Sequence, residues 1–302
     1  MDQPCLDPED VYEKRIIFTE MDFVRKLPEL VTSLPKWEAI HYFSEEPELD
    51  KLTIFNAVSN DLYITMYRRP TEEYAYFLKE FKNLVRVYVE LGAHKDLLLR
   101  FGIDSEKIIV APPPSIFERS FLEKEFSGKF VFASWNGGSE TALRERGLVA
   151  ILDVLTANPG TECNILLRDK ETEAYEKLIH KRGLDDKIML SHTVLYQDVK
   201  KAFLDADAVL FLMQKRLTKD VPNSIIEGFA LGKPVLMTSV VDFANVVMDQ
   251  GLGWVIRPGE MPDMNMVRAT YKKKAQNAFQ YSKNLTPETY INTVTDGYVN
   301  NI

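Results

Sequence analysis

Cysteine and histidine are scarce in this chain of 302 residues. The two cysteines, Cys5 and Cys163, lie far apart, and the four histidines are scattered without the spacing of metal ligands. Two separated cysteines do not make a disulfide framework, and no zinc pattern is present. We therefore expect no metal site and a reducing compartment, the cytoplasm.

Long apolar runs are also missing. No stretch approaches the roughly 18–20 apolar residues of a membrane-spanning helix, and the acidic start MDQPCLDPED lacks the apolar centre of a signal peptide. Lys272, Lys273 and Lys274 are interpreted as a solvated helix face, with contact to anionic lipid as the alternative. The prediction is a cytoplasmic protein without a transmembrane segment, for which peripheral attachment to a membrane is the alternative.

Positive charge is in deficit: 37 Lys and Arg residues stand against 45 Asp and Glu, which gives a net charge of −8. Sequence-independent nucleic-acid binding depends on Lys and Arg side chains that neutralise phosphates, so we expect no nucleic-acid partner. The chain contains neither G-x-G-x-x-G nor G-x-x-x-x-G-K-[ST]. A nicotinamide-dependent dehydrogenase and a P-loop nucleotidase are therefore disfavoured.

The sequence does have a regular alternation of short apolar runs with amphipathic segments. This pattern is typical of βαβ units, in which right-handed helical crossovers join parallel strands. Pro112, Pro113 and Pro114 interrupt the alternation, so residues 112–128 are predicted to link two domains. Before this link we expect strands at residues 15–19, 38–43, 61–67, 86–90 and 107–111, helices at 22–33, 71–83 and 93–101, and either type at 52–58.

A second series of the same kind follows the link. Its run at residues 208–213 is apolar, as expected for a strand that is buried on both faces. The two series together predict the α/β class, with two Rossmann-like domains in tandem and a helical C-terminus. We expect strands at residues 130–134, 163–168, 188–190, 208–213, 234–238 and 254–256, and helices at 146–156, 171–182, 197–205, 222–231, 266–283 and 287–299.

The segment 219–235, KDVPNSIIEGFALGKPV, carries most of the functional information. Pro222 or Asn223 suits the start of a helix, and Asn and Ser are good N-cap residues. The free N–H groups and partial positive charge of a helix start favour a phosphate. Glu227 follows at i,i+3 and i,i+4 spacing on the same helix face. Its carboxylate can accept hydrogen bonds from two ribose hydroxyls there. From the residues alone, an ordinary βαβ turn with a capped helix and a solvated Glu is the alternative.

The same segment resembles the donor-site signature of family 4 and related glycosyltransferases of the GT-B type. That signature is a Glu, seven residues, a second Glu, small residues and Gly-Lys/Arg-Pro-Val. Glu227 stands at the second Glu, which binds the nucleotide ribose in the family, and residues 232–235 match the tail. The likeness covers about residues 85–260, through FGIDSEKIIVAPPPSIF at 101–117 and ADAVLFL at 206–212.

The resemblance implies a GT-B fold, in which two Rossmann-like domains face each other across a cleft. The C-terminal domain, residues 128–283, is expected to bind a nucleotide-diphosphate sugar. The N-terminal domain, residues 1–118, is expected to present an unknown acceptor, a glycan, lipid or protein, and the tail at 284–302 to pack back on it. The implied reaction is a metal-independent transfer of a hexose with retention of configuration, from a UDP-, GDP- or similar nucleotide sugar and without a cofactor.

The front of the motif departs from the family. Lys219 stands where the first Glu contacts the donor sugar near the reacting carbon, and a lysine cannot accept a hydrogen bond from a hydroxyl. Either Asp220 replaces this Glu by a one-residue shift, or the sugar is held differently, or turnover is weak or absent. Lys219 and Asp220 are therefore the catalytic candidates, together with His41, which resembles the family's strand histidine near the acceptor.

Further donor contacts are expected where strands of the second domain end. Gly137 and Gly138 let the backbone approach a phosphate closely. Arg146, with Arg144 as the alternative, stands where the family has a lysine that holds the diphosphate, whereas Trp135 replaces a family arginine. Residues that follow the next strands are expected near the diphosphate and the base. The predicted nucleotide-sugar-binding set is Gly137, Gly138, Arg146, Arg168, His192, Thr193, Asn223, Ser224 and Glu227.

Two other functions stay open. A GT-B-shaped protein that binds nucleotide-sugar, or nothing, and acts as a partner or scaffold is favoured by Lys219, Trp135 and the short first domain. A nucleotide-sugar 2-epimerase is the second alternative. Nucleotide binding without turnover supports the first, and nucleoside diphosphate released only when acceptor is added argues against the second.

Overall fold

The computed structural model describes residues 39–44, 61–134, 140–167, 172–192, 196–216 and 219–299. The elements expected at 15–19, 22–33 and 52–58 lie outside these ranges. The chain divides into two compact units, residues 1–110 and 111–302, and each is described by itself. Among the helices of the described ranges, none combines the length and the apolar character that spanning a bilayer requires.

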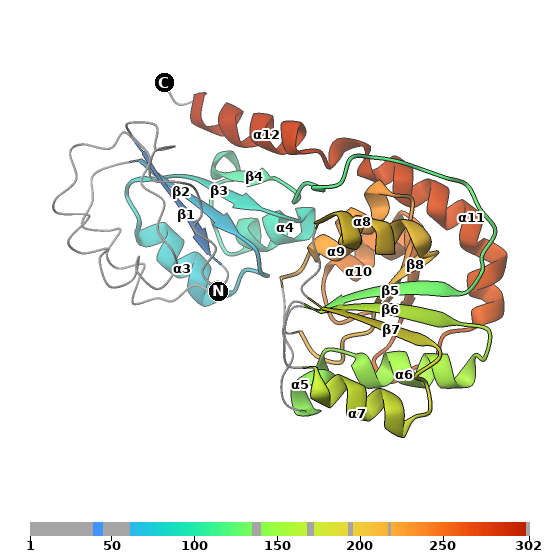
Figure 1. Ribbon diagram of the computed structural model, residues 1–302. Helices are drawn as coiled ribbons and strands as arrows, with labels where there is room; N and C mark the ends of the chain where they lie inside the picture. The colour runs from blue at the N-terminus through green and yellow to red at the C-terminus, as the bar shows by residue number, and fades with distance from the viewer. Residues whose placement is uncertain are drawn as a thin grey trace, which may run out of the picture. The chain divides into compact units, whose positions relative to one another are not determined.

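The first unit contains a four-stranded parallel sheet in the order β1-β2-β3-β4 (Figure 1). Strands that are neighbours in the sheet are also consecutive along the described chain, so right-handed crossovers place α3 and α4 on the same face. The strands expected at 38–43, 61–67, 86–90 and 107–111 and the helices expected at 71–83 and 93–101 are thereby confirmed, with a shorter last strand. The elements are β1 (Ala39–Ser44), β2 (Asp61–Met66), α3 (Glu72–Glu80), β3 (Leu84–Val89), α4 (Gly92–Arg100), the 3-10 turn η2 (Ser105–Lys107) and β4 (Ile108–Val110).

The two faces of this first sheet differ in chemistry. Side chains alternate between the faces along a strand. Leu62, Ile64 and Val87 are fully buried and pack into the apolar core with α3 and α4. The opposite face carries His41 and Tyr88, whose rings stack with centroids 5.3 Å apart.

The second unit contains a six-stranded parallel sheet in the order β10-β9-β8-β5-β6-β7. If β5 is counted as the first strand, β7 is the third and β10 the sixth. Starting from β7, the order is then 3-2-1-4-5-6, the order of a Rossmann sheet. Figure 1 shows α5, α6 and α7 along one face of the sheet and α8, α9 and α10 along the other. The strands are β5 (Lys129–Ser134), β6 (Glu162–Leu167), β7 (Ile188–His192), β8 (Ala208–Phe211), β9 (Val235–Thr238) and β10 (Gly253–Ile256).

The helices of the second unit complete the two faces and the C-terminus. Every side chain of β8 is buried, as the apolar run predicts for a central strand with helices on both faces. The packing of the tail on the first domain stays a prediction. The helices are α5 (Glu140–Glu145), α6 (Leu148–Ala157), α7 (Glu173–Lys181), α8 (Tyr196–Asp205), α9 (Asn223–Ala230), α10 (Phe243–Asp249), α11 (Met264–Tyr281), the 3-10 turn η3 (Ser282–Asn284) and α12 (Pro287–Val299).

The proline-rich segment at 111–128, which includes the predicted link at 112–128, forms a strap without helix or strand. It is fixed on the second unit. The Ser120 N–H donates to the carbonyl of Ala230 at 3.0 Å. Arg119 donates to the backbone carbonyl of Phe279 at 2.8 Å, and its guanidinium lies 4.3 Å from the centroid of the Phe279 ring. These contacts tie the strap to the last residue of α9 and to α11.

Asp207 anchors the end of this strap at the start of β5. One carboxylate oxygen accepts hydrogen bonds from the backbone N–H groups of Ser127, Gly128 and Lys129 at 2.7–2.9 Å, and from the Ser127 hydroxyl at 2.9 Å. The other oxygen lies 2.8 Å from Lys124 Nζ. Burial alone would raise the pKa of this carboxyl, but the Lys124 and backbone contacts outweigh it and lower the pKa. A buried carboxylate thus holds β5 beside β8.

Candidate functional site

The switch point of the six-stranded sheet lies between β5 and β8. The crossovers from these adjacent strands run to opposite faces, and ligands of open α/β sheets bind at the carboxyl ends of such strands. The segments that leave this edge are residues 135–147 after β5 and 212–222 after β8. Of the predicted donor-binding residues, Arg146 lies in the segment after β5, and Asn223, Ser224 and Glu227 lie in α9, which follows the segment after β8.

Helix α9 starts at Asn223, at the end of the segment that follows β8. Its N-cap is Pro222, in extended conformation and without a side-chain cap. The helix starts at Asn223, one of the two predicted starts, and proline's fixed φ suits the N-cap, so Asn223 and Ser224 lie in the first turn. The first turn still carries the partial positive charge of a helix start at the ligand edge.

The three candidate side chains of α9 share one face. Asn223 is exposed, Ser224 and Glu227 are half-buried, and the other side chains of the helix are buried. This confirms the common face predicted from the spacing.

The tail of the motif has a structural role. Lys233 is buried, and its Nζ donates to the carbonyls of Leu204 and Ala206 at 2.8 and 2.7 Å, which closes the end of α8. Burial lowers the pKa of this lysine to about 8. Gly228 lies against β8, where a Cβ would meet Val209 at 2.5 Å. Lys233 therefore joins the turn after α9 to the end of α8, and Gly228 lets α9 pack closely on β8.

Arg146 lies between two helices, which corrects the single helix expected at 146–156. Helix α5 ends at Glu145 and α6 begins at Leu148, and Gly147 between them has φ of +95°. The N–H of Gln214, from the segment after β8, donates to the Glu145 carbonyl at 2.8 Å. The half-buried Arg146 is thus held at the switch point, where its charge suits a diphosphate.

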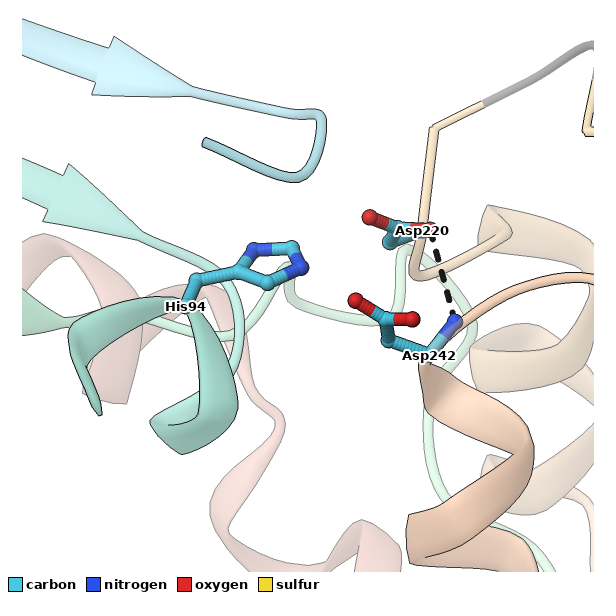
Figure 2. A group of neighbouring side chains, drawn as sticks. All are labelled: His94, Asp220 and Asp242. Carbon is cyan, nitrogen blue, oxygen red and sulfur yellow. Dashed lines mark hydrogen bonds between the residues drawn. The ribbon is translucent and has the colours of Figure 1, made fainter. Parts of the chain in front are cut away.

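Asp220 is engaged in a charge cluster at the carboxyl ends of β8 and β9. Arg216 Nη1 lies 2.9 and 3.0 Å from the two carboxylate oxygens of Asp220, and its Nη2 lies 2.8 Å from Asp242 Oδ1. The Asp242 N–H donates to Asp220 at 3.4 Å, as Figure 2 shows. Asp220 is therefore a counter-ion of Arg216. The half-buried Lys219 precedes it directly, and its catalytic role stays a prediction.

The third catalytic candidate, His41, lies in the first unit, at the third position of β1 and not at its end. Its Nε2 lies 2.8 Å from the Thr65 hydroxyl, and its ring stacks on Phe43 with centroids 4.3 Å apart. Burial lowers the pKa of His41 to about 4, so the imidazole is neutral near pH 7. A catalytic role for this neutral, hydrogen-bonded histidine stays a prediction.

Several predicted residues have no described side chain. Gly137, Gly138, Arg168 and Thr193 lie outside the described ranges, and of His192 only the backbone is described, as the last residue of β7. Their roles stay predictions.

Sequence analysis missed three charged or titratable residues near strand ends. Arg216 and Asp242 belong to segments that follow neighbouring strands, and His94, also drawn in Figure 2, lies in the first turn of α4 after β3. Only the parallel order of the strands, which places their carboxyl ends at one edge, points to such positions.

Residues 142–277 match the sequence model of the family described as Glycosyl transferases group 1. This segment contains α6 to β10 and most of α11, and with them the cluster and α9. This segment of the chain is therefore similar to the group 1 glycosyltransferases. Among curated proteins, none matches this sequence.

Solved structures agree with this fold. The lipopolysaccharide outer core galactosyltransferase WaaB aligns with a TM-score of 0.66 at 13% identity, over 93% of this chain and 80% of its own. Anabaena HepE in complex with UDP aligns with a TM-score of 0.68 at 14% identity, over 92% of this chain and 82% of its own. A glycosyltransferase from Rickettsia africae aligns with a TM-score of 0.67 at 13% identity, over 99% of this chain and 83% of its own. The GT-B fold, with two Rossmann-like domains, is confirmed.

Proposed function

We propose that this chain is a glycosyltransferase that moves a sugar from a nucleoside-diphosphate sugar to an acceptor. The observation that carries the proposal is the polar face of α9, with Asn223, Ser224 and Glu227, beside the switch point of a Rossmann sheet. This face lies within the segment that matches the glycosyltransferase family. Anabaena HepE, a structural neighbour, is solved with UDP-glucose and with UDP.

In this reaction the bond between the anomeric carbon and the diphosphate oxygen breaks, the acceptor oxygen bonds to the anomeric carbon, and the acceptor's proton passes to the departing diphosphate. Negative charge grows on the departing diphosphate. Arg146 and the first turn of α9 would stabilise that charge from fixed positions, which is how preorganised donors lower a barrier. We include in the proposal that no metal takes part and that configuration at the anomeric carbon is retained.

A titration with UDP and GDP, run beside assays of donor hydrolysis and transfer, tests the proposal. We expect a nucleoside diphosphate to bind and its sugar to be released or transferred. Absence of binding by both nucleotides would overturn the donor site.

Glu227→Ala is expected to weaken nucleotide binding by about 1–3 kcal/mol, or about 5–150-fold, because the carboxylate would lose charged hydrogen bonds to two ribose hydroxyls. Isothermal titration with UDP measures the loss. Glu173→Ala is the matched control, since Glu173 is an exposed helical glutamate on α7 that pairs only at the surface with Lys177. An affinity unchanged in Glu227→Ala would remove the ribose assignment.

A second function, nucleotide-sugar binding without turnover, is favoured by one observation. Lys219 stands where the family has its sugar-binding Glu, and the neighbouring carboxylate of Asp220 is taken up by Arg216. Saturable nucleotide binding with neither hydrolysis nor transfer would support this function over catalysis.

A further inference from the structure

Arg216 holds together two segments that leave the ligand edge of the second unit. It lies after β8, four residues before Asp220, and it reaches Asp242 at the start of α10, after β9. Its Nε also donates to the Val240 carbonyl at 3.2 Å. The guanidinium thus joins 212–222 to the segment that follows β9.

The planar fork of the guanidinium is suited to this task. Nη1 serves Asp220, Nη2 serves Asp242 and Nε serves a backbone carbonyl, so donors on all three nitrogens are used in fixed directions. Two carboxylates surround one guanidinium, which leaves little positive charge to attract an anionic ligand. A lysine has one point of charge and cannot reproduce the geometry.

We infer that Arg216 is a positioning residue for nucleotide binding, acting through Asp220 and Asp242 and not by contact with the diphosphate. The inference rests on the proposed function. Asp220 lies three residues before α9, so a fixed Asp220 fixes where the helix starts and where Asn223 and Glu227 stand. Asp220 and Asp242 then help to position the donor-binding residues of α9.

The sign of one substitution separates positioning from direct contact. If Arg216 bound the diphosphate directly, Asp242→Asn would free positive charge and strengthen UDP binding. If Arg216 positions the segment, Asp242→Asn weakens UDP binding, because the anchor after β9 is lost. Arg216→Lys keeps the charge but loses the fork, so positioning predicts weaker binding here too.

Isothermal titration of the full chain with UDP tests the inference. We expect the dissociation constant to rise about tenfold in Arg216→Lys and in Asp242→Asn, and by the same factor in the double variant, because residues of one network are coupled. Arg182→Lys and Asp153→Asn are matched controls, since this exposed pair has its Nη1 and Oδ1 2.8 Å apart. They should leave the affinity unchanged, and thermal melts should show every variant folded.

Stronger or unchanged UDP binding in Asp242→Asn would overturn the inference, and so would unchanged binding in Arg216→Lys. Hydrogen exchange of the ligand-free protein gives a second readout. Amides at 219–226 and 242–246 should exchange faster in both variants, while those of β6 and α7 keep their rates. If the unaltered chain binds neither UDP nor GDP, the proposed function fails, and unchanged exchange at these amides would then overturn the positioning role independently.

Discussion

Asp207→Ala is expected to lower the free energy of unfolding of the second unit by about 3–5 kcal/mol, the usual cost of breaking a buried, hydrogen-bonded charge pair. The alanine leaves three backbone N–H groups at residues 127–129 without their acceptor and Lys124 without its counter-ion. Because these groups connect the strap and β5 to the residue before β8, the two strands at the switch point lose their common anchor.

Urea unfolding followed by circular dichroism measures this loss. Asp205→Ala is the matched control: Asp205 is exposed, and its backbone carbonyl, which alanine keeps, accepts a hydrogen bond from Lys124. Surface substitutions of this kind stay within about 0.5 kcal/mol. A cost for Asp207→Ala no larger than for Asp205→Ala would contradict the anchoring role.

The Asp207 contribution should also depend on pH. Its pKa is lowered in the folded chain, so its stabilisation is fully present above the unfolded value of about 3.9 and is lost as pH falls below it through the folded pKa. The difference in stability between the unaltered chain and Asp207→Asn should therefore shrink in acid. A difference that is constant from neutral pH to about pH 3 would contradict a charged role.

The parallel sheet of the second unit was predictable because each strand has a local signal. The run at 208–213 is apolar on every residue, which only a strand with both faces covered needs, and β8 is buried throughout. The face of α9 was predictable for a similar reason, since helical spacing alone brings Asn223, Ser224 and Glu227 together.

The charge cluster was not predictable in the same way. Arg216 and Asp242 are 26 residues apart and meet because β8 and β9 are adjacent and parallel, a fact of topology that neither segment encodes. The choice between the two predicted starts of α9 was also left open by the residues. Asn and Ser are the more common N-caps, but Pro222 has a φ of −66° that suits the N-cap, and the helix starts at Asn223.

The break between α5 and α6 also had a cause that composition does not show. A helical pattern runs through residues 146–156, yet Gly147 has φ of +95°, which ends one helix and starts the next. A Cβ on Gly147 would lie 2.2 Å from the carbonyl oxygen of Leu212. Glycine is needed here twice, for the backbone angle and for the close approach of the segment after β8.

Gly147→Ala is therefore expected to cost about 2–5 kcal/mol of unfolding free energy, as the sum of a left-handed backbone penalty of about 1–2 and an overpacking cost of about 1–3. Gly183→Ala separates the two parts. Gly183 also has positive φ, at +63°, but a Cβ there would meet nothing within 4 Å, so only the backbone penalty applies. Urea unfolding of both variants gives the difference, which is the energy of the close approach at Leu212.

Because the clash is with backbone, Gly147→Ala must also shift Arg146 or the segment after β8, and UDP affinity should fall in Gly147→Ala but not in Gly183→Ala. Equal costs in the two variants would show that the switch point tolerates a side chain at residue 147.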